Sequence, residues 1–459
     1  MAFGLGFNFK GFSMPLQNPF YLKYFPNKIQ QRLEGRHNLF AVLHNSGWLI
    51  ADKVFKAVVT IVVGAWVARY LGPAEYGKLA YILAIVAFFQ VISNLGLDGI
   101  VVREIAKKKD EAGVILGTTF MMRMIVGILC WMGLVVFMLA IYGWGNENVW
   151  LALLVGGSLI FQAADTIDLW FQSQTQSRRT VLAKFIAVLI SSLLRVAFIT
   201  FKAPLIYFAM AFSIEWGIAA LALLISYQKF KCGQTWMIRL TDTGVILLSQ
   251  SWYFIVALFS YMIYTKIDQL MIKNILGGKE LGIYSAATVI STGFYIIPMT
   301  LQNSLLPIMT RLRKNDEQLF LKQLTRIFRI LALTSIVICL LTVWQSENLV
   351  QFVYGVKYIR GSGILAIHVF TIIPIFMSAG QNLWIFIEGK SKLFLLQCII
   401  GGIVSLILNS FLIQKFGIVG AATSAIIVQF IATVFSNYFL DRDLFYLQFG
   451  IKKINISSQ

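Results

Sequence analysis

The stretch Leu71-Gly72-Pro73-Ala74-Glu75-Tyr76-Gly77 has a second copy in the chain, Leu276-Gly277-Gly278-Lys279-Glu280-Leu281-Gly282. Both copies follow the pattern LGxxExG, and the offset from position 71 to position 276 is 205 residues. Each copy ends one apolar run and precedes another, across a turn of the kind that glycine permits. The same offset pairs the sequence NSGW at 45–48 with QSWY at 250–253. The chain is therefore predicted to consist of two related halves.

The composition is that of a membrane protein. Of the 459 residues, 58% are hydrophobic and 13% are charged, whereas an ordinary soluble domain is about 45–50% apolar and about 25% charged. A helix needs about 20 mostly apolar residues to cross a bilayer, where its backbone must satisfy its own hydrogen bonds. Such runs are predicted to begin near Gly47, Leu79, Gly117, Val149, Val181, Pro204, Ser249, Tyr284, Ile327, Ile364, Leu393 and Gly417.

These runs and the repeat predict an all-α polytopic membrane protein with about 12 transmembrane helices, arranged as two pseudo-symmetric six-helix bundles around a central cavity. Hydropathy alone would end the seventh span near Tyr264, but alignment with the first span extends it towards Asn274. The predicted units are a cytoplasmic tail at 1–44, a first bundle at 45–228, a cytoplasmic linker at 229–248, a second bundle at 249–441 and a cytoplasmic tail at 442–459.

The positive charge of the chain indicates its orientation in the membrane. The formal net charge of +19 is carried by short clusters between the apolar runs, without the aromatic and basic pattern of a nucleic-acid-binding module. Lys and Arg are concentrated in the loops on the side of both termini, which the positive-inside rule makes cytoplasmic. The strongest markers are Arg103 with the lysines at 107–109, the arginines at 178–179, and Arg311, Arg313 and Lys314. We expect no nucleic-acid partner.

Ionisable residues inside the predicted spans are the candidate functional groups. Each costs about 3 kcal/mol to insert, so such residues normally face a protein interior or a hydrated cavity. The predicted cavity cations are Lys53, Lys56, Arg123, Arg195 and Lys266, and the predicted cavity acids are Asp52, Asp165, Glu215 and Asp268. Two other interpretations stay open: that these cations and acids pair only to hold helices together, or that acids such as Asp52, Glu215 and Asp268 carry coupling protons. Lys184 and Asp168 lie near the cytoplasmic edge, where a side chain can extend to water.

Catalytic and metal chemistry have little support in the sequence. The four cysteines and three histidines are scattered, without the spacing of a metal-ligand set. We predict no catalytic residue, no cofactor and no metal.

Several motifs resemble one known family. They are Trp66-Val67-Ala68-Arg69-Tyr70 followed by the first repeat copy, Asn94-Leu95-Gly96-Leu97, Ile100-Val101-Val102-Arg103-Glu104-Ile105-Ala106, Leu169-Trp170-Phe171-Gln172, and Glu280-Leu281-Gly282-Ile283-Tyr284-Ser285-Ala286-Ala287. They are similar to the bacterial polysaccharide and O-antigen repeat-unit flippases of the multidrug, oligosaccharidyl-lipid and polysaccharide exporter superfamily. The resemblance runs from about Asn45 to Asp441.

The resemblance implies a transporter, not an enzyme. It would translocate an undecaprenyl-diphosphate-linked oligosaccharide across the bacterial inner membrane by alternating access. The cavity cations suit the diphosphate, and Asp, Asn and Gln suit the sugar hydroxyls. The bilayer, a polysaccharide polymerase and a chain-length regulator are the further partners that the resemblance suggests.

Two other functions are weighed against a flippase. A multidrug or organic-cation antiporter of the same superfamily would favour an acidic, aromatic cavity, whereas cations and acids are about equally numerous in the spans of the first half. A membrane polysaccharide polymerase or ligase would need a sizeable outward loop bearing Arg or His, and the predicted loops supply none.

Overall fold

The structure is a computed structural model that describes residues 37–230 and 235–451, apart from the side chains at 37–54, 56, 57 and 60. Helices make up most of these ranges, and no strand occurs in them. The first half contains α2 (His37–Asn94), α3 (Asp98–Lys107), η2 (Lys109–Glu111), α4 (Ala112–Tyr142), α5 (Glu147–Phe161), η3 (Gln162–Ala164), α6 (Asp165–Ser173), α7 (Ser177–Thr200) and α8 (Leu205–Phe230).

The second half repeats this all-helical construction. It contains η4 (Leu240–Gly244), α9 (Val245–Leu276), α10 (Gly278–Gly293), α11 (Ile296–Asn315), α12 (Glu317–Tyr354), η5 (Val356–Tyr358), α13 (Gly361–His368), η6 (Val369–Thr371), α14 (Ile372–Ile387), α15 (Ser391–Phe430), η7 (Ile431–Phe435), α16 (Ser436–Leu440) and α17 (Arg442–Phe449).

The expectation of about 12 spans agrees with the structure. Ten continuous helical stretches in the described residues are long and apolar enough to cross a membrane. Two of them each contain a second span, because Gly72 in α2 has φ 73° and Gly417 in α15 has φ 62°, and both interrupt the helix. The seventh span is also confirmed to pass Tyr264, since α9 continues to Leu276.

The backbone repeats the symmetry of the sequence. Gly72 has φ 73° and ψ 169°, and the equivalent Gly277 has φ 93° and ψ 173°. The turns after the third and ninth spans agree in the same way, at Gly143 (φ 77°, ψ 171°) and Gly355 (φ 82°, ψ 176°). Glycine enters this region without the penalty that a Cβ atom brings. The two halves thus leave the membrane through the same kind of turn.

The two LGxxExG stretches lie against each other where the halves meet. A Cβ atom on Gly77 would collide with the carbonyl oxygen of Gly278, and one on Gly282 would collide with the carbonyl oxygen of Pro73. Position 77 corresponds to 282 and position 73 to 278, so the contact is itself two-fold symmetric. We call the end of the molecule where these stretches meet the closed end.

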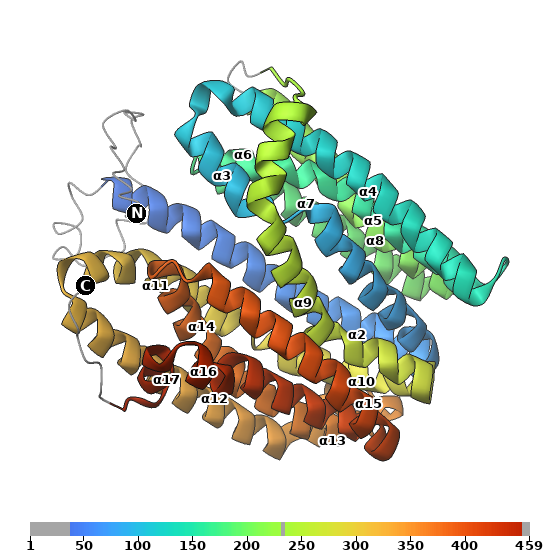
Figure 1. Cartoon of the computed structure of the whole chain (residues 1–459). Helices are drawn as coiled ribbons and strands as arrows, with labels where there is room; N and C mark the ends of the chain where they lie inside the picture. The colour runs from blue at the N-terminus through green and yellow to red at the C-terminus, as the bar shows by residue number, and fades with distance from the viewer. Residues whose placement is uncertain (1–36, 231–234, 452–459) are drawn as a thin grey trace, which may run out of the picture.

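The hydrophobic cluster with the most buried residues joins the two halves at the closed end. One cluster combines Ala68 and Leu79 of the first half with Tyr284, Tyr354 and Tyr358 of the second. Towards the opposite end, one cluster belongs to the first half and the start of α9, and another belongs wholly to the second half. Figure 1 shows α2 and α10 together at the closed end, whereas α3 and α6 lie away from α11, α14 and α17.

Candidate functional site

Arg123 on α4 is fully buried. Its Nη2 donates to Asp98 Oδ1 at 2.6 Å and to the carbonyl oxygen of Asn94 at 3.3 Å. Its Nε and Nη1 have no hydrogen-bond partner among the described residues. A buried unpaired donor costs about 1–3 kcal/mol, so an acceptor that reached this guanidinium would bind favourably.

Lys184 on α7 forms the most connected ion pair of the first half. Its Nζ lies 2.8 Å from Asp165 Oδ1 and 2.6 Å from Asp168 Oδ2, which are both on α6. Asp165, predicted as a cavity acid, is therefore an ion-pair partner that joins α6 to α7. This agrees with the interpretation in which some intramembrane charges hold helices together.

Arg195 and Glu215 join α7 to α8. Arg195 Nη2 lies 2.8 Å from Glu215 Oε2, which also accepts from Ser191 Oγ at 2.9 Å. The guanidinium of Arg195 lies 4.7 Å from the centre of the Phe212 ring. Both charged side chains keep part of their surface accessible, 14% for Arg195 and 26% for Glu215.

Lys266 and Asp268 belong to a polar cluster between α9, α10 and α13. Asp268 is buried, accepts from the Tyr284 hydroxyl and accepts from the backbone N–H of Gln269 at 2.8 Å. Lys266 precedes Asp268 by two residues on α9, and the His368 ring lies edge to face with the Tyr284 ring, with centres 6.2 Å apart. His368 Nδ1 lies 2.7 Å from Ser291 Oγ. The cluster combines one cation, one acid and neutral hydrogen-bonding groups.

The remaining predicted residues, Asp52, Lys53 and Lys56, lie on α2, but their side chains fall outside the described residues. Arg123, Arg195 and Lys266 belong to three separate groups, and no ion pair between described side chains connects one group to another. A vestibule shared by all five cations stays a prediction.

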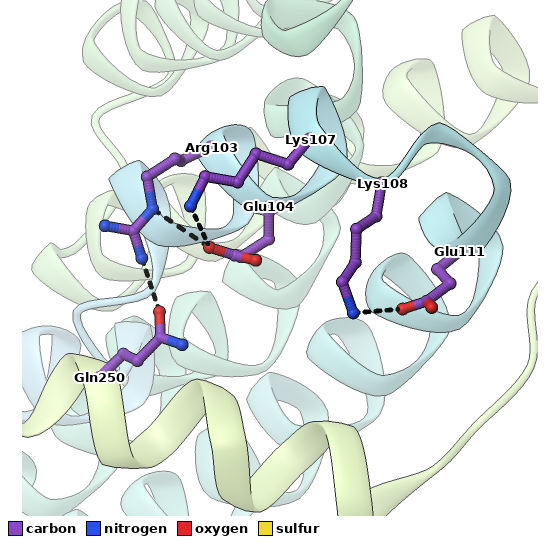
Figure 2. A network of polar contacts seen from close by, with 6 residues as sticks. All are labelled: Arg103, Glu104, Lys107, Lys108, Glu111 and Gln250. Atoms are coloured by element: carbon purple, nitrogen blue, oxygen red, sulfur yellow. Dashed lines mark hydrogen bonds and ion pairs between the residues drawn. The ribbon is translucent and has the colours of Figure 1, made fainter. Parts of the chain in front are cut away.

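The start of α9 rests on the first half, although α9 belongs to the second. Arg103 on α3 donates from Nη2 to Gln250 Oε1 on α9 at 2.6 Å, as Figure 2 shows. Arg103 Nε and Lys107 Nζ lie 3.2 and 3.4 Å from Glu104 Oε1. Lys108 and Glu111 form a further ion pair at 3.0 Å. Arg103, expected to mark membrane orientation, thus also connects α3 to α9.

A cavity of about 250 Å³ lies inside the second half, among α9, α11, α14, α15 and η7. No charged side chain lines it; its polar lining is Tyr261, Tyr264, Tyr295, Gln302, Ser378, Gln381, Asn382, Gln397, Gln429 and Thr433. The search for ionisable residues in spans missed these groups. The available signal was the occurrence of five Gln or Asn side chains in otherwise apolar spans of one half.

The comparison with protein families gives one match. The profile of the family described as "Polysaccharide biosynthesis protein" matches residues 42–313. The capsular polysaccharide biosynthesis protein CapF of Staphylococcus aureus is 27% identical over 188 residues, which are 39% of this chain and 45% of CapF. The chain spans less than half the length of the curated relatives that it matches.

Solved structures with the same fold include two kinds of membrane transporter. An inward-facing multidrug resistance MATE family transporter of the MOP superfamily has a TM-score of 0.68 at 13% identity, and covers 86% of this chain and 95% of that one. The lipid II flippase MurJ in an inward closed conformation has a TM-score of 0.65 at 15% identity. The match covers 89% of this chain and 90% of the MurJ chain. At these identities the likeness establishes the architecture.

Proposed function

Because the chain belongs to the polysaccharide biosynthesis protein family, we propose that it is a flippase for an undecaprenyl-diphosphate-linked oligosaccharide in the bacterial inner membrane. The substrate would be an O-antigen or related polysaccharide repeat unit, moved from the cytoplasmic to the outer face. A polysaccharide polymerase and a chain-length regulator would then act on the product. CapF is a capsular polysaccharide biosynthesis protein and MurJ is a lipid II flippase, which supports a lipid-linked glycan as substrate.

The asymmetric packing of the halves is the observation that carries the mechanism. One core joins them at the closed end; towards the other end, one cluster belongs to the first half with the start of α9 and another belongs to the second half. Helix α3, which carries Arg103 and Lys107, lies at that other end in Figure 1, and we assign this end, with both termini, to the cytoplasm. The described conformation is then inward-facing and accepts a substrate made on the cytoplasmic side. Separation of the closed end, with closure of the other, would release it outside.

The charged groups would bind and release the diphosphate by exchanging partners. Arg123 and Arg195 each already hold a carboxylate, from Asp98 and Glu215 respectively. A phosphate oxygen can replace a carboxylate as acceptor for the same N–H groups, without leaving a buried charge unpaired. Lys266 would act in the same way beside Asp268. Lys53 and Lys56 are proposed to extend this cationic surface along α2.

Deletion of the gene tests the proposal. We expect surface glycan to disappear and the lipid-linked oligosaccharide to accumulate where a membrane-impermeant oxidant, added outside spheroplasts, cannot reach its sugars. The fold is shared with a MATE transporter, so efflux of a cationic dye is measured in the same strains. Unchanged surface glycan with reduced dye efflux would replace the flippase with the antiporter.

A further inference from the structure

The cavity in the second half differs in chemistry from the charged groups described above. Its lining of tyrosines, glutamines, Asn382, Ser378 and Thr433 carries no formal charge. A phosphate would find no cation there, and an organic cation would find no carboxylate. The groups that the cavity offers are hydroxyls and amides, which both donate and accept hydrogen bonds.

Part of this lining is held rigidly by its own hydrogen bonds. Gln381 Nε2 donates to Gln397 Oε1 at 2.8 Å, and Gln397 Nε2 donates to Asn437 Oδ1 at 2.5 Å. Asn437 Nδ2 in turn donates to Gln381 Oε1 at 2.9 Å, which closes a ring of three amides. Gln448 Nε2 also donates to Gln381 Oε1, at 3.2 Å. These residues connect α14, α15, α16 and α17. The closed ring of amides fixes one wall of the cavity.

The other wall carries hydrogen-bonding capacity that the protein leaves unused. Asn382 Nδ2 donates to Gln302 Oε1 at 3.1 Å, but Asn382 Oδ1 and Gln302 Nε2 have no partner in the described part of the chain. The same holds, within residues 37–230 and 235–451, for the side-chain amide of Gln429 and the hydroxyls of Tyr261 and Tyr264. Tyr264 and Tyr261 lie edge to face, with ring centres 5.0 Å apart.

We propose that this cavity is a sugar-binding subsite that takes one neutral sugar unit of the translocated molecule. A sugar ring presents hydroxyls that match the free amide and tyrosine groups, and C–H faces that pack on the tyrosine rings. A volume of about 250 Å³ accommodates one sugar unit and excludes a whole oligosaccharide. The proposal rests on the proposed flippase function and names the part of the protein that recognises the glycan.

The position of the cavity fits a substrate with a charged head next to its sugars. Tyr264 lines the cavity and lies two residues before Lys266 on α9. Tyr295, on the opposite wall, shares a 2.8 Å hydrogen bond with Thr371 Oγ1, which donates to the carbonyl oxygen of His368 at 2.8 Å. The neutral subsite therefore adjoins the Lys266 and Asp268 cluster. A diphosphate near Lys266 would place the attached sugars within reach of the cavity.

Thermal unfolding of the purified full chain in detergent tests the subsite with two probes. The probes are undecaprenyl diphosphate, which has no sugar, and the lipid-linked oligosaccharide extracted from the deletion strain. A ligand raises Tm according to its affinity for the folded state. We expect the wild type to be stabilised by both probes, and more by the one that carries sugars.

Three variants, Gln302→Ala, Asn382→Ala and Gln429→Ala, remove cavity amides one at a time. Each variant should lose the additional Tm shift due to the sugars and keep the Tm shift due to undecaprenyl diphosphate. Each should also transport about fivefold more slowly, as expected for the loss of one hydrogen bond. The matched controls are Gln345→Ala and Asn348→Ala, which disrupt a 2.8 Å amide pair on α12 outside the cavity. Both controls should behave as wild type.

The two proposals fail in different ways. If the cavity variants respond to the oligosaccharide as the wild type does, the subsite is wrong and the flippase function stands. If neither probe stabilises the wild type and deletion leaves surface glycan intact, the flippase function itself is wrong. Variants that unfold before any probe is added are replaced by Tyr261→Phe, which removes only a hydroxyl from the cavity wall.

Discussion

Gly77 and Gly282 hold equivalent places in the two halves, and each lies directly against the backbone of the other half. A side chain on Gly77 would collide with Gly278, and a side chain on Gly282 would collide with Pro73. The closest approach of the halves is therefore backbone to backbone, at the centre of the internal repeat. Around this contact, the Tyr76 ring of the first half packs edge to face on the Tyr358 ring of the second, with ring centres 6.3 Å apart.

Substitution of either glycine should separate the closed end. Gly77→Ala and Gly282→Ala should each destabilise the described conformation by about 1–3 kcal/mol, as for an overpacked contact. The measurement is Tm of the purified protein in detergent. Gly64→Ala is the matched control, since a Cβ atom at Gly64 of α2 meets no atom within 4 Å. Equal Tm values for Gly77→Ala and Gly64→Ala would contradict the prediction.

Tyr358→Phe should loosen the closed end without a general loss of stability. The Tyr358 hydroxyl donates to the carbonyl oxygen of Ala68 at 2.8 Å, across the two halves. Loss of this buried bond, at about 1 kcal/mol, should raise the open fraction of the closed end about fivefold. Hydrogen exchange of the backbone amides around 61–68 and 350–358 measures that fraction.

Tyr70→Phe is the control for this change. In the wild type, the Tyr70 hydroxyl donates a comparable 2.9 Å hydrogen bond to the carbonyl oxygen of Ala203, but both residues belong to the first half. Faster exchange in both variants, at the same segments, would mean that the Tyr358 bond has no special role between the halves.

Arg123→Lys should reduce transport about tenfold while leaving the protein folded. The substitution keeps the positive charge but removes the planar fork that binds a phosphate through two N–H groups. Export of the lipid-linked oligosaccharide is measured in the complemented deletion strain, together with the amount of protein in the membrane. Arg103→Lys is the control, because Arg103 is half-exposed and connects α3 to Gln250. Normal export by Arg123→Lys would remove Arg123 from the substrate path.

The sequence was sufficient to predict the spans and the repeat, because hydropathy and glycine turns are local properties. Gly72 and Gly277 could be matched from their neighbours alone, and their backbone angles agree. The contact between Gly77 and Gly278 depends on how the halves face each other, which no local pattern contains. The pairing of Arg123 with Asp98 likewise required α3 to fold back against α4.

The amide cavity was missed for an energetic reason. A search based on the cost of insertion finds Lys266 and Asp268, because charged groups are the expensive ones in a membrane. Gln381 and Gln397 cost less and satisfy each other at 2.8 Å. A search for amides that recur in the spans of one half would have found them.

Gly401→Ala should weaken sugar binding by moving a wall of the cavity. A Cβ atom at Gly401 would lie 3.0 Å from Tyr264 Cδ1 and 3.1 Å from Ala432 Cβ, which is too close for either to stay in place. Tyr264 and Ala432 both line the cavity, so the room left for a sugar decreases. The neighbouring Gly402→Ala is the control, because its Cβ atom would have ordinary contacts of 3.4 Å or more. In the two-probe unfolding assay, Gly401→Ala should lose most of the Tm shift due to the sugars, and Gly402→Ala should keep it. If both variants keep it, Tyr264 does not contact the sugar.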